Sequence, residues 1–189
     1  MAVAAVLVTT TLGAPEVASY PLTAPAPVEV GAHRVGPITV TVDASAPDAW
    51  TFFDFSRGSV VDSPQAEEWD LAFQRHRIIA NGGQGLAGEA GVVRLEGMHF
   101  DSVGSVPETG YVVAGEATDS VNPALERWYD YSWTSHLLEP KPAVYALRTA
   151  DGRYAKFEIL GYYCPGARAG CLTIRYVYQG AGGFEVRTP

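Results

Sequence analysis

The hydrophobic positions of this chain fall in short runs that alternate with polar positions and are separated by turn residues. Residues 38–42 (ITVTV) alternate strictly, and residues 144–148 and 153–160 flank the dipeptide Asp151-Gly152. Because successive side chains of a strand point to opposite faces, these runs predict β-strands, and the Asp-Gly dipeptide predicts a hairpin turn. The same pattern predicts strands at residues 50–55, 59–61 and 172–178.

One further run is rich in aromatic residues and leads into a glycine-rich segment. Residues 69–79 (WDLAFQRHRII) place Trp69, Leu71 and Phe73 at alternating positions, which predicts a single half-buried strand. Residues 81–91 (NGGQGLAGEAG) contain five glycines. They predict a loop whose backbone can approach another surface closely.

Helical signals are limited to single turns. Ser63-Pro64 and Asn122-Pro123 each combine an N-cap residue with Pro at the first helical position, but no sustained 3.6-residue apolar period follows either pair. The sequence contains no internal repeat. It therefore predicts an all-β fold, a single antiparallel β domain of many short strands with one-turn helices.

The amino-terminal part of the chain has a different composition. Residues 2–12 (AVAAVLVTTTL) have the length and texture of the apolar part of a secretory signal peptide, although no Lys or Arg precedes Arg34. The alternative is an apolar tail without an export role. Five of the thirteen prolines lie between Pro15 and Pro37, which indicates an extended linker. We therefore divide the chain into an export segment with a Pro-rich linker, residues 1–37, and an all-β domain, residues 38–189.

Composition and charge exclude several classes of protein. Of the 189 residues 47% are apolar and 18% charged, and the formal net charge is −8. A disordered chain would contain fewer apolar residues, and a membrane-spanning helix needs a run of about 20 of them, so no transmembrane span is predicted. Binding to nucleic acid depends largely on clustered Lys and Arg, and we therefore exclude nucleic acid as a partner.

The two cysteines, Cys164 and Cys171, flank residues 165–170 (PGARAG) between two strand-like runs. If these runs form a hairpin, both cysteines lie near its neck, within reach of a disulfide, which would agree with export. One alternative is two free thiols in a cytosolic protein. A zinc site is less favoured, because it would need two more ligands and usually has a shorter spacing.

No motif in the chain indicates a known class of enzyme. There is no G-x-S-x-G, H-E-x-x-H, Walker or dinucleotide-binding motif, and we predict a non-enzymatic protein. Neutral imidazole and thioether groups are axial ligands of haem iron, so the histidines and Met98 are candidate ligands. For each histidine the alternative is an ordinary surface or hydrogen-bonded residue. The four histidines are His33, His76, His99 and His136.

A cluster of aromatic residues precedes His136. Trp128, Tyr129, Tyr131 and Trp133 lie at adjacent and alternating positions. Such a cluster would supply a flat apolar surface for a porphyrin, or it would pack in the core and at the rim of a sheet.

Several motifs then follow one another in a defined order. They are residues 69–76 (WDLAFQRH) leading into Asn81-Gly82-Gly83, Gly110-Tyr111, residues 128–132 (WYDYS) and residues 144–157 (VYALRTADGRYAKF). In this order they resemble the HmuY family, whose members are exported, often lipid-anchored bacterial proteins. The resemblance extends from about residue 38 to residue 178 and covers most of the chain.

The resemblance implies an all-β fold and, for the best-known members, capture of haem at the bacterial cell surface. It therefore implies haem as the cofactor, a role in haem-iron acquisition, and an outer-membrane receptor as partner. The location it implies is exported: the periplasm, the outer-membrane surface or the extracellular space. Neither cysteine lies near the amino terminus, so no lipid anchor is expected.

The resemblance also indicates where two axial ligands would lie. The second ligand position falls on Trp133, which cannot ligate iron, so His136, three residues later, is the expected iron ligand. His99 or Met98 is its candidate partner, and Tyr131 and Trp133 are expected contacts of the porphyrin.

The first ligand position would lie in residues 112–127, which contain no His, Met or Cys. Because neither ligand position of the family is retained, we keep an alternative function. It is an exported β-sheet surface or binding module on the same scaffold whose ligand is not haem. Such a module would bind through residues 81–91 and the aromatic residues at 128–133.

Overall fold

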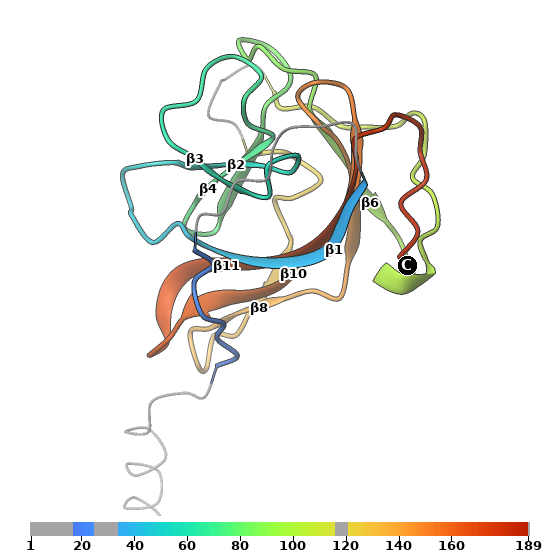
Figure 1. Ribbon diagram of the computed structural model, residues 1–189. Helices are drawn as coiled ribbons and strands as arrows, with labels where there is room; N and C mark the ends of the chain where they lie inside the picture. Colours follow the sequence, from blue (N-terminus) through green and yellow to red (C-terminus); the bar gives the residue numbers. More distant parts are fainter. Residues whose placement is uncertain (1–16, 25–33, 116–120, 189) are drawn as a thin grey trace, which may run out of the picture.

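The computed structural model describes residues 17–24, 34–115 and 121–188 (Figure 1). Strands account for 46% of the structure and helix for 2%, and the sheets are antiparallel. The prediction of an all-β fold is therefore confirmed. The predicted export segment lies outside the described residues, so its role stays a prediction. Among the described residues no helix is both long enough and apolar enough to cross a membrane.

The larger sheet has five antiparallel strands. In spatial order they are β1 (Arg34–Asp43), β11 (Arg168–Gln179), β10 (Tyr154–Cys164), β9 (Val144–Arg148) and β6 (Gly91–Leu95). The longest hairpin, β10–β11, occupies the middle of this sheet, so its tip extends beyond the shorter neighbouring strands (Figure 1).

The smaller sheet has four strands and lies above the larger one in Figure 1. A separate two-stranded hairpin precedes β9 in the chain. The strands of the smaller sheet are, in spatial order, β3 (Ser59–Val61), β2 (Thr51–Asp54), β4 (Leu71–Gln74) and β5 (Arg77–Ala80), and those of the hairpin are β7 (Tyr129–Tyr131) and β8 (Leu138–Pro140).

The main core lies between the two larger sheets and is built from alternating positions of both. Alternation places every second side chain of a strand on the same face, and burying that face stabilises the fold by about 25 cal/mol per Å² of apolar surface. The most buried core residues include Phe53, Leu71, Phe73, Ile78, Val42, Tyr145, Phe157, Ile174 and Tyr176.

Most predicted strands are confirmed, with longer strands where the pairing extends beyond the apolar run. The predicted bounds of β3 and β9 agree with the structure. Strand β1 begins at Arg34, ahead of the predicted start at Ile38, because its first residues pair with the end of β11. The boundary between linker and domain stays a prediction.

The prediction of a single strand over residues 69–79 is wrong. The chain reverses at Arg75 and His76, and Gln74 pairs with Arg77, so this segment forms the hairpin β4–β5. Neither turn residue is Gly, Asn, Asp or Pro, the residue types that usually signal a turn. The reversal therefore has no recognisable sequence signal.

The one-turn helices are also placed differently from the prediction. Ser63-Pro64 and Asn122-Pro123 lie in bends and turns, although Asn122 does cap a turn by accepting the Ala124 N–H at 3.0 Å. The helix of the described residues is the 3₁₀ helix η1 (Phe100–Ser102), which follows β6.

The glycine-rich segment after β5 is a tightly packed loop. A Cβ at Gly82 would lie 1.9 Å from the Ala90 carbonyl oxygen, and one at Gly88 would lie 2.5 Å from the Asn81 carbonyl oxygen. Asn81 is buried, and its side-chain amide donates to the backbone oxygens of Ala66 and Trp69 at 2.8 and 2.9 Å. These glycines therefore serve close packing of the backbone.

Part of the predicted linker contacts the domain. The backbone N–H of Thr23 donates to the Thr41 oxygen at 3.1 Å, and Thr41 N–H donates to the Thr23 hydroxyl at 2.8 Å. A Cβ at Gly161 would lie 3.1 Å from the Tyr20 ring, so this ring packs closely on β10. Residues 17–24 thus lie against the larger sheet.

Candidate ligand-binding groove

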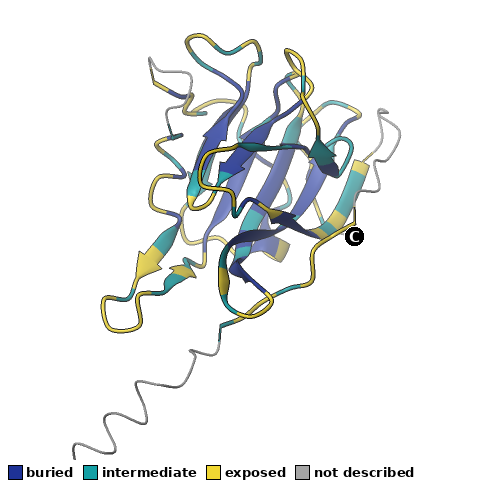
Figure 2. Cartoon of the chain, turned by 90° about the vertical axis from the view of Figure 1, so that its left-hand side faces the viewer, coloured by how far each residue is buried: buried dark blue, intermediate teal, exposed yellow. Residues whose placement is uncertain are grey.

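Three of the five predicted ligand-contacting residues lie on the β7–β8 hairpin. Tyr131 ends β7, and Trp133 and His136 lie in the segment that connects it to β8. Tyr131 is 55% exposed and Trp133 78%, and Figure 2 shows the exposed hairpin projecting from the buried strands. The Tyr131 hydroxyl lies 2.5 Å from His136 Nδ1. The structure therefore brings Tyr131 and His136 together and leaves Trp133 in solvent.

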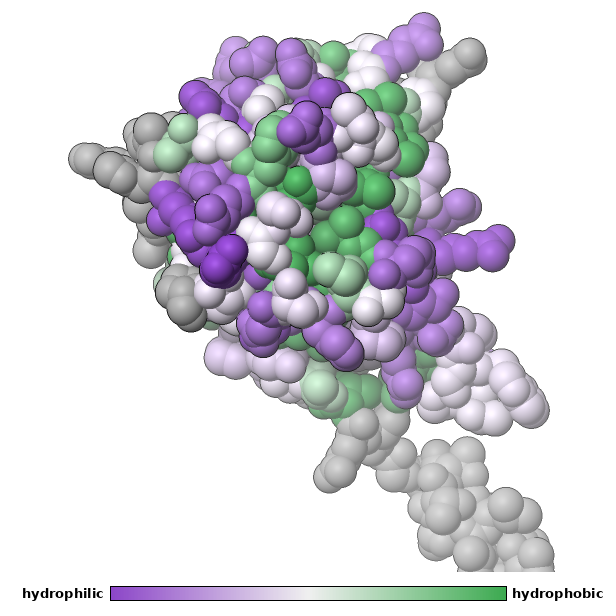
Figure 3. All heavy atoms as spheres, turned by 90° about the vertical axis from the view of Figure 1, so that its right-hand side faces the viewer, coloured by the Kyte–Doolittle hydropathy of each residue, from purple (hydrophilic) through white to green (hydrophobic). Residues whose placement is uncertain are grey.

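The other two predicted residues, Met98 and His99, lie directly before η1 and are exposed. Helix η1 is at the right of Figure 1, whereas β8 is at the bottom, so the two regions are well separated. Figure 3 views the side that carries η1, where apolar residues gather in the middle and polar residues surround them. The structure does not bring Met98 or His99 near His136.

A groove of about 460 Å³ lies beside His136, where the tips of three hairpins meet. The β4–β5 turn contributes Arg75 and His76, and the β7–β8 hairpin contributes Tyr129 and His136. The β10–β11 tip contributes Ala167, with Tyr162 from β10 below it. Two histidines from segments far apart in the sequence therefore line one groove.

His76 was one of four candidate histidines, but it was not placed in the expected ligand pair. The predicted strand over residues 69–79 placed this histidine in the middle of a strand, whereas it lies at an exposed hairpin tip. The one signal that could have drawn attention to it is Arg75-His76-Arg77, an unusual concentration of basic residues in an acidic chain.

Hydrogen bonds and ring contacts hold the walls of the groove in place. The buried Trp128 donates its indole N–H to the His76 backbone oxygen at 2.9 Å. The His76 and Tyr129 rings meet edge to face with centroids 5.8 Å apart. The Leu138 N–H donates to the Tyr163 hydroxyl at 2.8 Å, which joins the β7–β8 hairpin to β10.

The surroundings of His76 favour its neutral form. Partial burial lowers the pKa of His76, and the neighbouring charges of Arg75 and Arg77 lower it further. Neutral imidazole has a free ring nitrogen and is the form that binds metals. Burial also raises the pKa of the Tyr162 phenol, so this hydroxyl keeps its proton.

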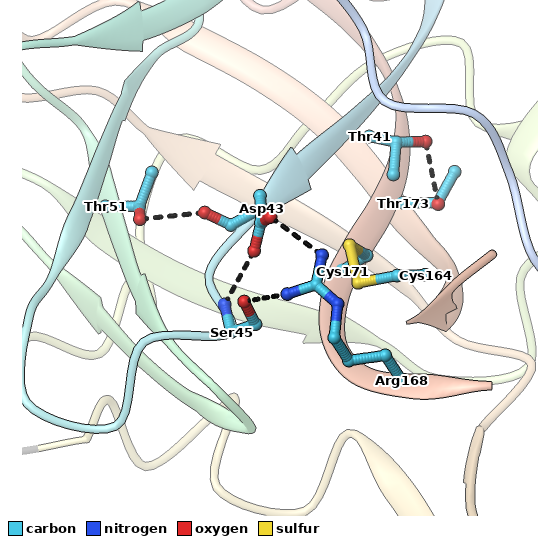
Figure 4. The surroundings of a disulfide bond; sticks show 8 residues. All are labelled: Thr41, Asp43, Ser45, Thr51, Cys164, Arg168, Cys171 and Thr173. Atoms are coloured by element: carbon cyan, nitrogen blue, oxygen red, sulfur yellow. Dashed lines mark hydrogen bonds and ion pairs between the residues drawn. A yellow bond between two sulfur atoms is a disulfide. The ribbon is translucent and has the colours of Figure 1, made fainter. Parts of the chain in front are cut away.

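A disulfide joins the two strands of the β10–β11 hairpin at the base of its tip. Cys164 and Cys171 are bonded, as predicted, and enclose Ala167 and Ala169, which both line the groove. Arg168, between these two alanines, binds the Asp43 carboxylate at 3.0 Å and the Ser45 hydroxyl, as Figure 4 shows. The disulfide therefore joins β10 to β11 at this wall of the groove, and the contacts of Arg168 join the same wall to the end of β1.

The donor set of this groove is of the kind that haem iron accepts. Two imidazoles can serve as axial ligands of haem iron, and Tyr129 and Tyr162 provide aromatic walls. The volume lies in the range of about 300 to 1,000 Å³ usual for sites of small molecules and cofactors.

The family model described as HmuY protein matches residues 46–176. The chain belongs to the HmuY family. Among the curated proteins none matches this chain. The resemblance noted from the motif order is thereby confirmed.

Solved structures of HmuY relatives share the fold. A candidate HmuY-like haem-binding protein from Bacteroides vulgatus is 22% identical, with a TM-score of 0.60, and the match covers 81% of this chain and 96% of that one. An apo HmuY analogue from Tannerella forsythia is 17% identical, with a TM-score of 0.60 and coverage of 80% and 99%. A candidate lipoprotein from Bacteroides fragilis is 21% identical, with a TM-score of 0.60 and coverage of 81% and 93%.

Proposed function

We propose that this HmuY-family chain is an exported, non-enzymatic protein that binds haem or a related porphyrin for haem-iron acquisition. Its partners would then be haem and an outer-membrane receptor. The observation that carries the proposal is the groove in which His76 and His136 lie with Tyr129 and Tyr162. Membership of the family and a structural relative named as haem-binding support it.

In this proposal His136 and His76 would hold the haem iron, and the aromatic residues would pack against the porphyrin. Neutral imidazole nitrogens are ligands that haem iron accepts. The lowered pKa of His76 keeps its imidazole ready to bind. His76 thus replaces His99 and Met98 as the proposed partner of His136, because these two lie directly before η1 and do not line the groove.

Titration of the purified protein with hemin, followed in the Soret region, tests the proposal. We expect a sharp Soret shift for the unaltered protein and a loss of affinity of about tenfold or more in His136→Ala and in His76→Ala. The matched control is His99→Ala, because His99 is an exposed histidine outside the groove. This variant should bind hemin as the unaltered protein does.

Two outcomes would contradict the proposal. A spectrum identical to that of free hemin would exclude haem binding and favour the alternative function, a β-sheet module with a different ligand. A Soret shift that is lost in His99→Ala and kept in His76→Ala would place the ligands near η1 and not in the groove.

A further inference from the structure

Among the described residues, Arg75 lacks the carboxylate partner that six other basic residues of this acidic protein have. Within the described residues, the Arg75 guanidinium forms no ion pair with a carboxylate, although it lies in the candidate groove. The chain has 21 acidic and 13 basic residues, so acidic partners are plentiful. Basic residues that do pair with a carboxylate are Arg57, Arg94, Lys141, Arg168, Arg175 and Arg187.

The side chain of Arg75 is held at the wall of the groove. Its guanidinium hydrogen-bonds to the Tyr162 hydroxyl, and its backbone N–H donates to the Ala44 oxygen at 2.7 Å. A guanidinium has five N–H donors. One contact with a phenol therefore leaves most of them available to a ligand.

The backbone at the groove is strained. Arg75, His136 and Ala167 have φ values of 54°, 58° and 60°, and they are three of the five non-glycine residues with positive φ among the described residues. Each lies at the tip of a different hairpin and lines the groove. Glycine or asparagine would adopt this conformation at lower cost, and strain of this kind clusters at binding sites.

We propose that Arg75 is a specificity-determining residue that binds a carboxylate of the groove's ligand. The groove then selects planar porphyrins that carry free carboxylate groups. A guanidinium matches a carboxylate in shape and can form two parallel hydrogen bonds with it. This inference rests on the proposed function, since it assumes that a porphyrin occupies the groove.

Hemin and hemin dimethyl ester are the two probes, because they differ only in whether the carboxylates are free. We expect the unaltered protein to bind hemin about tenfold more tightly than the ester, since hydrogen bonds to charged groups are the strong ones. Arg75→Gln should lose this preference and bind the two probes equally. Arg75→Lys should keep part of it, because the charge remains.

The control variant is Arg187→Gln, which removes an exposed arginine that lies outside the groove. It should keep the full preference for hemin. Equal binding of both probes to the unaltered protein, with a clear Soret shift, would overturn the role of Arg75 and leave the proposed function intact. If Arg75→Gln weakens the binding of both probes by the same factor, the role of Arg75 is likewise overturned and the proposed function is left intact. No Soret shift with either probe would overturn the proposed function itself.

Discussion

The groove and the region around η1 each contain a basic side chain, and the two side chains have different partners. Lys156 is fully buried, and its ammonium donates to the Phe100 oxygen at 2.8 Å, the Val103 oxygen at 2.9 Å and the Thr188 hydroxyl at 2.9 Å. Among the described residues Arg75, in the groove, contacts the neutral Tyr162 hydroxyl and pairs with no carboxylate. The ammonium of Lys156 has its hydrogen-bond partners inside the protein, whereas a cation without a carboxylate partner remains available to a ligand.

The histidines of the two regions show the same contrast. His99, before η1, has ordinary extended backbone with φ −98° and ψ 147°, and Ser102 bonds to both its N–H and its carbonyl. His136, in the groove, has φ 58° at a hairpin tip. We therefore assign His136, whose backbone is strained, to ligand binding. His99, whose backbone is unstrained, we assign to the hydrogen bonds that hold η1.

The largest expected effect is on the stability of the η1 region. Lys156→Met removes the donor that satisfies two buried carbonyl oxygens, which should cost about 2 to 4 kcal/mol of unfolding free energy. Hemin affinity should stay within about twofold of that of the unaltered protein, because the groove is unchanged. Urea unfolding and a hemin titration measure the two quantities. A large loss of hemin affinity in the folded variant would show that the η1 region and the groove are not independent.

The chain has one other lysine, Lys141, and it provides the matched control. Lys141 lies 3.4 Å from the Asp130 carboxylate, which is largely exposed. Lys141→Met should cost at most about 1 kcal/mol, because such ion pairs are weak. Equal losses from the two variants would mean that the hydrogen bonds of Lys156 contribute little.

The pH dependence of stability sharpens the contrast. Burial lowers the pKa of Lys156 from 10.5 to about 8, so between these values the unfolded chain binds a proton that the folded one does not. This group therefore makes the protein more stable as the pH rises from about 8 to about 10.5. Between pH 8 and pH 10 the unfolding free energy of the unaltered protein should therefore rise relative to that of Lys156→Met. An equal change in both proteins would contradict a lowered pKa for Lys156.

The disulfide should affect stability and, unlike Lys156, also the groove. Cys164→Ser combined with Cys171→Ser opens a short ring and should cost about 2 to 3 kcal/mol by loop-closure entropy. Because Ala167 and Ala169 lie within that ring and line the groove, hemin affinity should fall as well. Melting curves and hemin titrations with and without reductant give the same test on the unaltered chain. Unchanged affinity after reduction would show that the wall keeps its shape without the bond.

Much of the fold could be predicted because the strands of a half-buried sheet show a local alternation of apolar and polar residues. Val144–Arg148 and Ser59–Val61 were predicted with the bounds of β9 and β3. The hairpin and its disulfide were also predicted, since two alternating runs around a short loop bring Cys164 and Cys171 together. Strands β7 and β8 were missed, because three-residue strands that end at a proline, such as Leu138–Pro140, carry no alternation.

The candidate site was harder to predict because it depends on turns that lack turn residues. A Gly or Asn at position 75 would have revealed the reversal between β4 and β5, and with it the exposed position of His76. The meeting of three hairpin tips is a property of the packed sheets, and no local pattern encodes it. His136 was predicted because it lies three residues after Trp133, on which the second ligand position of the family falls, whereas its proposed partner lies about sixty residues earlier, in an apparent strand.

The smallest expected effect separates backbone strain from binding. Arg75→Gly relieves a left-handed backbone and should raise the unfolding free energy by up to about 1 kcal/mol, since glycine adopts positive φ without steric cost. It should also weaken hemin binding about tenfold, because the guanidinium is gone.

Ala167→Gly is the control, as it relieves the same strain at a neighbouring hairpin tip without removing a charge. It should stabilise the protein by a similar amount and bind hemin normally. If Ala167→Gly weakens hemin as much as Arg75→Gly does, loss of a rigid hairpin tip and not loss of the guanidinium would explain both results.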